Sequence, residues 1–142
     1  MEDNNNPSVR YAIFCGGIKR TEPGKFNILD ARDGIEEKLE WKGEGQPPKE
    51  HVLKYPIKLL IGLLDISTDK HEIGLEVIRP SGIFEKSSEP QEFTGEDVFF
   101  GLARVLVNLE LDIVENGTYL FNIILDGKLL TEIKLPVVIH RL

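Results

Sequence analysis

The chain has 142 residues, of which 41% are hydrophobic and 29% charged, and its net charge is -7 at neutral pH. This length fits one domain, and the composition is that of a folded globular protein rather than a disordered chain. The excess of acids argues against a broad nucleic-acid-binding face, which needs many lysines and arginines. Fifteen Ile and nine Val against three Ala favour strands over helices.

The N-terminal residues bear on domain boundaries and on location. Residues 1–8 are polar, so we expect a disordered tail before one domain over residues 9–142. The tail lacks the basic start and apolar centre of a secretory signal. The longest apolar-rich stretch, residues 57–66, is too short to cross a bilayer. A single cysteine, Cys15, cannot form an internal disulfide. Together these features predict a cytoplasmic protein.

The first third of the chain is predicted to hold two strands and a less regular segment. Residues 9–15 are apolar on both faces, as in a buried strand, and Gly16-Gly17 ends the run. After a turn at Pro23-Gly24, we expect residues 26–31 to return beside this strand as a hairpin with a long loop. Residues 34–41 fit either a strand or a short helical turn.

The middle of the chain begins with an irregular loop over residues 42–50, whose Pro47-Pro48 pair cannot lie in a central strand. Residues 57–66 form a near-continuous apolar run of strand length, and we interpret them as a central strand. Residues 71–79 alternate between apolar and polar. A tight Pro-Ser-Gly turn then leads to a short return strand at residues 83–86.

The last third contains the clearest alternation. Residues 103–113 have one apolar face, as expected for a strand with one solvated side. The preceding residues 94–100 allow a second interpretation, a short capped helix. Residues 119–125 and 129–137 also alternate, with leucine and other apolar residues at alternate positions. The Asp126-Gly127 pair between them is a strong short-range sign of a β-hairpin.

Counting these runs gives about eight or nine short strands with a turn about every ten residues. The sequence therefore predicts an all-β protein, a single two-layer antiparallel β-sandwich of the immunoglobulin-like, Greek-key type. Gly117 and Tyr119 fit a tyrosine corner, in which the tyrosine hydroxyl bonds back to a nearby backbone group at the start of a strand. The role of this motif, like that of Asp126-Gly127, is structural.

Residues able to carry chemistry are present but scattered. Cys15 lies in an apolar strand without a nearby base, which favours a buried structural thiol. The histidines show no metal-ligand spacing, and we expect His71 and Asp69 to be solvated at a turn. The acids in the loops include Asp30, Asp33, Asp65 and Asp69. They could supply oxygen ligands to calcium, but we favour the interpretation that they are solvated surface residues, since calcium needs six or more converging oxygens. We therefore expect no cofactor, no metal and no enzymatic activity.

Three stretches together resemble a known family: Tyr11 to Cys15 with Gly24 to Leu29, Leu75 to Gly82, and Gly117 to Phe121 with Leu125 to Lys128. The family consists of small bacterial cytosolic immunoglobulin-like β-sandwich proteins catalogued as a domain of unknown function. The resemblance covers most of residues 9–139 and implies a fold, without catalytic residues to transfer. The longer polar N-terminus and Pro47-Pro48 depart from the family pattern.

The leading functional hypothesis is a non-enzymatic module for protein–protein interaction or assembly, with a protein partner or self-association and neither nucleic acid nor membrane. Trp41, the only tryptophan, borders the long loop, and Tyr55 follows it, so these two residues are the candidate partner-binding residues. A buried Trp41 in the core is the competing interpretation. Two rival functions are a small-ligand, calcium or carbohydrate-binding sandwich that uses its acidic loops, and an enzyme whose site converges from distant residues.

Overall fold

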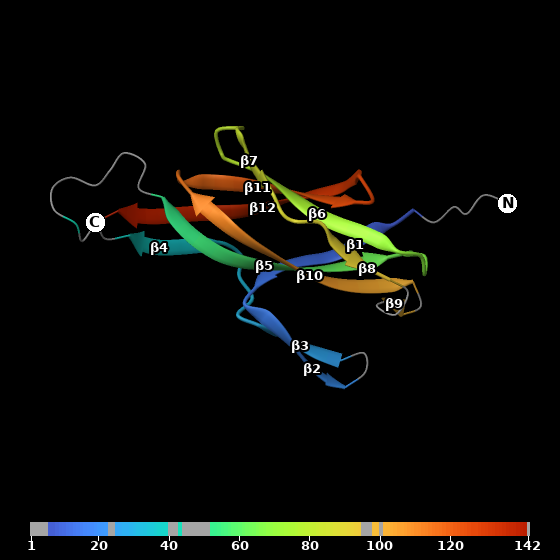
Figure 1. Cartoon of the computed structure of the whole chain (residues 1–142). Helices are drawn as coiled ribbons and strands as arrows, with labels where there is room; N and C mark the ends of the chain where they lie inside the picture. Colours follow the sequence, from blue (N-terminus) through green and yellow to red (C-terminus); the bar gives the residue numbers. More distant parts are fainter. Residues whose placement is uncertain are drawn as a thin grey trace.

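A computed structural model describes residues 6–22, 25–39, 43, 52–94, 98–99 and 101–141. Every regular element within them is a β-strand, and most of the strands form two sheets that face each other (Figure 1). The strands are β1 (Ser8–Cys15), β2 (Gly17–Glu22), β3 (Lys25–Leu29), β4 (Ile35–Leu39), β5 (Leu53–Leu64), β6 (His71–Ile78), β7 (Phe84–Ser87), β8 (Gln91–Phe93), β9 (Val98–Phe99), β10 (Leu102–Ile113), β11 (Gly117–Leu125) and β12 (Lys128–Arg141).

The first sheet has four strands in the order β1-β5-β10-β9. Its central strand is β5, as the apolar run predicts, and its middle residues Leu59, Leu60 and Ile61 are fully buried although they point to opposite faces. β5 is longer than predicted because it begins at Leu53, where it already pairs with Ile113 of β10.

The second sheet has the order β4-β12-β11-β6-β7, with β8 beside β6. Its strands pair antiparallel except for β4, which runs parallel to the end of β12. The N-terminal region therefore contributes β1 to one sheet and β4 to the other, and the connections between the sheets are those of a Greek key. The chain is an immunoglobulin-like β-sandwich, which confirms the predicted fold class.

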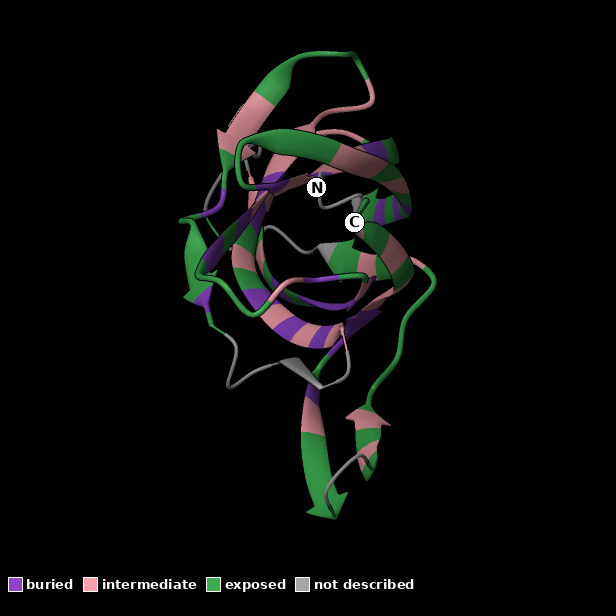
Figure 2. Cartoon of the chain, turned by 90° about the vertical axis from the view of Figure 1, so that its right-hand side faces the viewer, coloured by how far each residue is buried: buried purple, intermediate pink, exposed green. Residues whose placement is uncertain are grey.

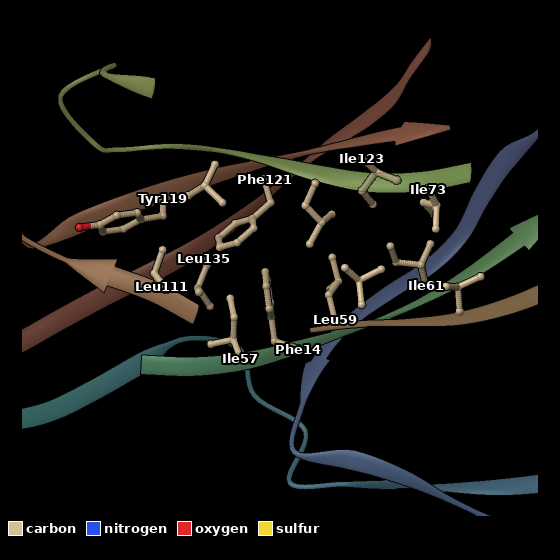
Figure 3. Packing of buried hydrophobic residues seen from close by; sticks show 14 of the residues in the cluster. Phe14, Ile57, Leu59, Ile61, Ile73, Leu111, Tyr119, Phe121, Ile123 and Leu135 are labelled. Carbon is tan, nitrogen blue, oxygen red and sulfur yellow. The ribbon is translucent and has the colours of Figure 1, made fainter. Parts of the chain in front are cut away.

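The core lies between the two sheets, and alternate residues of β5, β10, β11 and β12 fill it (Figure 3). Phe14 and Phe121 meet edge to face across the core, with ring centroids 5.1 Å apart. The burial of each large apolar side chain contributes roughly 1.5–3 kcal/mol to the stability of the fold. The facing apolar surfaces therefore hold the two sheets together.

A separate hairpin of β2 and β3 extends from the first sheet, as Figures 1 and 2 show. The Arg104 guanidinium of β10 lies over the Phe26 ring of this hairpin. The guanidinium carbon is 3.9 Å from the ring centroid, a cation–π contact. The predicted return strand thus exists, but its partner is β2 rather than β1. Glu22 pairs with Lys25, so the two strands that pair are those closest to each other in the sequence.

Several predicted boundaries need correction. β1 begins at Ser8, inside the predicted tail of residues 1–8, and residues 1–5 lie outside the described residues. Residues 35–39 form a strand, so the helical-turn alternative is wrong. Val98 and Phe99 form β9, so the short helix through Phe100 is wrong as well; residues 95–97 and 100 are not among those described.

Leu129 is the one residue of the predicted apolar face of the last strand that points the wrong way. A register shift between Ile123 and Ile124 places one extra residue in β12. Leu130 consequently packs against the core, whereas Leu129 is 59% exposed. The hairpin turn at Asp126-Gly127 lies where it was predicted, with Asp126 and Gly127 both at positive φ.

Candidate functional site

Of the two predicted partner-binding residues, Trp41 and Tyr55, only Tyr55 lies among the described residues. Trp41 lies outside the described residues, as does most of the loop over residues 42–50. Tyr55 is half-buried on β5, where its ring packs against the edge of the core. The guanidinium carbon of Arg32 lies 5.4 Å from the centroid of this ring, so an aromatic and a cationic group meet at one end of the sandwich.

A groove of about 490 Å³ opens beside Pro56, on the outer face of the first sheet. We call it the hairpin-base groove because it lies where β1 gives way to the β2–β3 hairpin. Its lining includes Cys15, Gly16, Pro56, Lys58, Asn108 and Glu110. A smaller hollow of about 50 Å³, lined by Tyr55 and Arg32 among others, shares Cys15, Gly16 and Pro56 with it. Tyr55 therefore lines the smaller hollow next to the groove, while its ring faces the core side of β5 opposite Leu111.

The groove exists because β1 stops pairing before β5 does. The last pair between them joins Cys15 to Lys58, and Pro56, two residues before Lys58 in β5, has no N–H to offer a neighbouring strand. The chain instead turns away at Gly16, whose N–H donates to the Leu29 carbonyl at 2.7 Å. A proline inside a strand is the sequence signal that could have located this edge.

The groove combines an apolar base with a charged rim. Its Cys15 side chain is only 5% exposed and forms no disulfide. Lys58 and Glu110 supply opposite charges on neighbouring strands, and Glu110 also pairs with Lys54 at 3.7 Å near the surface. Such a surface offers apolar contact together with polar groups that fix orientation, which is the usual composition of protein interfaces.

Tyr119 stands at the start of β11 with its ring fully buried in the core (Figure 3). Its hydroxyl donates to the Glu115 carbonyl at 3.1 Å and accepts from the N–H groups of Val114 and Glu115. Burial raises the pKa of Tyr119, although the two backbone donors act in the opposite direction. This is the geometry of a tyrosine corner, and it fixes the turn before β11.

His71 is buried rather than solvated, which corrects the expectation from sequence. Its Nδ1 lies 2.7 Å from Asp126 Oδ2, and its Nε2 lies 3.0 Å from the Ser67 carbonyl and 3.1 Å from Ser67 Oγ. Burial lowers the pKa of His71, but the hydrogen bonds to Asp126 and Ser67 and the charges of Asp126 and Asp69 together raise it above 6.5. Asp126 comes 55 residues later, so local spacing could not reveal the contact.

Ser67, His71 and Asp126 have the connectivity of a catalytic triad, but the hydrogen bonds favour a different role. A carbonyl oxygen only accepts, so the Nε2 that faces the Ser67 carbonyl carries a proton. A base toward Ser67 would need that nitrogen unprotonated. His71 therefore donates through Nδ1 to Asp126 and through Nε2 to the Ser67 carbonyl. The contact with Asp126 connects the β11–β12 turn to the start of β6. Asp126 Oδ1 strengthens this connection, because it accepts from the Glu72 N–H at 2.8 Å.

A charged cluster joins the free edges of the two sheets. Lys86 of β7 donates to the Glu110 carbonyl at 2.6 Å and pairs with Asp112 at 3.3 Å, both on β10. The neighbouring Glu85 side chain is 2% exposed; it pairs with Arg79 at 3.3 Å, while its Oε2 has no hydrogen-bond partner. Burial raises the pKa of Glu85, although Arg79 and Lys86 oppose the shift.

The loop acids considered for calcium do not converge in the described part of the chain. No group of three or more His, Cys, Asp or Glu side chains in that part is placed to hold a metal ion. Asp30 and Asp65 instead occupy turns at positive φ, and Asp69 accepts from Ser67 Oγ at 3.1 Å. Nor do the described residues include a helix that could span a membrane.

Comparison with known proteins gives remote structural matches. No protein-family model and no curated protein matches the sequence. An immunoglobulin-like protein from Pseudomonas aeruginosa matches with 12% identity and a TM-score of 0.45, over 94% of this chain and 97% of that chain. The Pseudomonas fluorescens alkylpurine DNA glycosylase AlkC, bound to DNA, matches with 9% identity and a TM-score of 0.46. This match covers 96% of this chain but only 31% of the glycosylase.

Proposed function

We propose that this chain is a non-enzymatic interaction module whose protein partner binds in the hairpin-base groove. The observation that carries the proposal is the groove itself, about 490 Å³ with an apolar base and a rim that includes Lys58, Asn108 and Glu110. Half-buried Tyr55 under Arg32 adjoins it, and aromatic and arginine side chains are common anchors of interfaces. The net charge of -7 disfavours nucleic acid as the partner.

The same proposal includes location and family. A lone buried cysteine suits a reducing compartment, and we therefore place the module in the cytoplasm. Membership of the bacterial family of unknown function rests on the resemblance described above and is part of this proposal. Its supporting observation is the shared immunoglobulin-like fold.

Site-directed photo-crosslinking tests the groove. A benzoylphenylalanine at Asn108 should capture a partner that the same group at Glu36, exposed on β4, does not capture. With the captured protein purified, Lys58→Glu should weaken binding about tenfold, whereas Lys38→Glu should leave it unchanged. Equal capture from both positions, or equal affinity of both charge-reversal variants, would contradict the proposal.

Trp41 provides a second readout through its fluorescence. If Trp41 belongs to the partner surface, its emission is red-shifted, is quenched by acrylamide and changes when the partner binds. Blue-shifted emission that resists quenching, together with unfolding of Trp41→Ala, would place this side chain in the core and remove it from the proposed surface.

The rival function as a calcium or carbohydrate-binding sandwich predicts a different result. Thermal unfolding with calcium and with a panel of sugars would then show stabilisation, about 2.7 kcal/mol at a hundredfold excess over Kd. For calcium, Asp30→Ala or Asp65→Ala should abolish the effect. The lack of a converging acidic cluster among the described residues places this function second.

A further inference from the structure

The outer face of the second sheet carries a row of hydrogen-bond acceptors across three strands. Glu76 of β6 pairs with Asn122 of β11, which in turn pairs with Glu132 of β12. All three point away from the core, because their chain neighbours Leu75, Val77, Phe121 and Ile123 fill it. We call these residues the acceptor row.

The two carboxylates of the acceptor row have no cationic partner among the described residues, although the Asn122 amide between them has N–H donors as well as an acceptor. Neither Glu76 nor Glu132 forms an ion pair with any described residue, and Asn122 Oδ1 is buried without a hydrogen-bond partner. The nearest cation in the register, Lys134, belongs to the adjacent row opposite Leu120 and is equally unpaired among these residues. Unpaired carboxylates can accept charge-assisted hydrogen bonds from an added donor, so Glu76 and Glu132 are open to a cationic group.

A hollow of about 220 Å³ lies beside the acceptor row. Gly74 and Ile124, which pair across β6 and β11, form its floor, and Pro90 stands on one side where the chain leaves β7. Glu72 and Glu76 flank Gly74 on the same strand, so the hollow is apolar at its base and acidic at both ends. Exposed Leu129, opposite Ile124, continues the apolar surface.

The hollow beside the acceptor row is locally acidic, because Glu72 and Glu76 are among the residues that line it and no lysine or arginine is. The outer face of the first sheet instead carries both signs, since Lys54 lies opposite Asp112 and Glu110 lies on the rim of the hairpin-base groove. Charge complementarity selects a cationic segment for the second face.

Arginine suits the acceptor row better than lysine does. Directly opposite side chains on neighbouring strands begin about 4.5–5.5 Å apart, so the row presents acceptors at intervals across the sheet. A planar guanidinium has five N–H donors and can bridge two such acceptors, while an ammonium group acts as a point charge. The adjoining apolar hollow would take a neighbouring apolar side chain of the same segment.

We propose that the acceptor row binds an arginine side chain of an apolar, basic protein segment, whose next apolar residue enters the hollow over Gly74 and Ile124. This inference rests on the proposed role as an interaction module and extends that role to the opposite face of the sandwich. It involves only β6, β11 and β12, so its failure would leave the hairpin-base groove unaffected.

The test uses a fluorescein-labelled, end-capped peptide of alternating leucine and arginine, with citrulline and lysine versions as comparisons. In fluorescence polarisation, the arginine peptide should bind, the lysine peptide should bind more weakly and the citrulline peptide should not bind. Combining Glu76→Gln with Glu132→Gln should weaken binding at least about tenfold, as expected for the loss of two charge-assisted contacts.

The matched control removes two charges elsewhere, with Glu22→Gln on the hairpin and Asp33→Asn beyond it, both exposed. This control should bind like the unmodified protein. Peptide-induced NMR shifts should include the amide of Gly74 and the side-chain amide of Asn122. The proposal is overturned if no peptide binds, if the citrulline peptide binds equally well, if both double variants lose equal affinity, or if the shifts lie at the hairpin-base groove instead.

Discussion

The side chains of Tyr119 and His71 form hydrogen bonds with backbone groups that have no partner in the strand ladders. The Tyr119 hydroxyl serves three backbone groups at once, one as donor and two as acceptor. His71 serves one carboxylate and one carbonyl. Both residues stand beside turns between strands, where ladder bonding ends and side chains must replace it.

Tyr119→Phe should destabilise the domain by about 1–3 kcal/mol, because backbone groups of Val114 and Glu115 lose their partner while the ring stays in the core. The denaturant midpoint at constant slope measures this change. Tyr55→Phe is the matched control, since its hydroxyl has no hydrogen-bond partner among the described residues. A midpoint for Tyr119→Phe equal to that of the control would mean that only the packing of Tyr119 matters.

His71 should make stability depend on pH near neutrality. Its pKa in the folded state is raised above 6.5, so the protonated form is favoured by folding. The resulting stabilisation is complete below pH 6.5 and is lost as pH rises through the raised pKa. Urea unfolding of His71→Gln across this range should lack that decline, whereas exposed His140→Gln should retain it. A decline of the same size in His71→Gln would assign it to other groups.

At the scale of elements, close packing between strands constrains the sequence as strongly as the apolar pattern does. The Tyr11 ring of β1 lies directly over Gly62 of β5, and a Cβ on Gly62 would overlap it. Arg104 of β10 pairs with the same glycine from the other side. The side chain of Tyr11 therefore occupies the space above Gly62 on the outer face of the first sheet, and Arg104 lies opposite the same glycine on the other neighbouring strand.

Gly62→Ala should destabilise the protein by about 1–3 kcal/mol, the usual cost of overpacking. The cause is the Tyr11 ring, so the effect should be much smaller when Tyr11→Ala is already present. A double-mutant cycle by denaturant unfolding measures the coupling between the two positions. Additive effects would indicate that the glycine is needed for the backbone of β5 itself.

The charged edge between β7 and β10 allows a prediction for Glu85. Because burial raises the pKa of Glu85 above 4.5, ionisation costs stability as pH rises through the raised value. Glu85→Gln should therefore stabilise the domain at neutral pH and should reduce the decline between acid and neutral pH. A lower melting temperature for this variant at neutral pH would show that the Arg79 ion pair outweighs the burial of charge.

Particular residues show why elements were predictable and their contacts were not. The alternation over residues 103–113 and the Asp126-Gly127 turn depend on near neighbours, and both appear where expected. The hairpin-base groove depends on where β1 ends beside Pro56, which is a property of two strands about forty residues apart. Likewise the partner of His71 is Asp126, and the acceptor row exists only through the register of three strands.

At the scale of the whole molecule, two sheets share one core and a hairpin stands outside it. The far-ultraviolet circular dichroism spectrum should accordingly show strand with little helix, and a helix content above about a third, the globular average, would contradict the fold. Each outer face carries its own hollow. The two surfaces proposed for contact are therefore separate, and the variants proposed for one do not disturb the other.

The parallel pairing of β4 with β12 also determines when the fold can be completed. Ile35 and Val137 are paired although about a hundred residues separate them in sequence. Contacts of such long range slow folding, and during synthesis β4 emerges long before its partner. Until β12 is made, β4 and β11 present unpaired strand edges on which neighbouring nascent chains can add. The last strand thus completes the second sheet and withdraws these edges from misassembly.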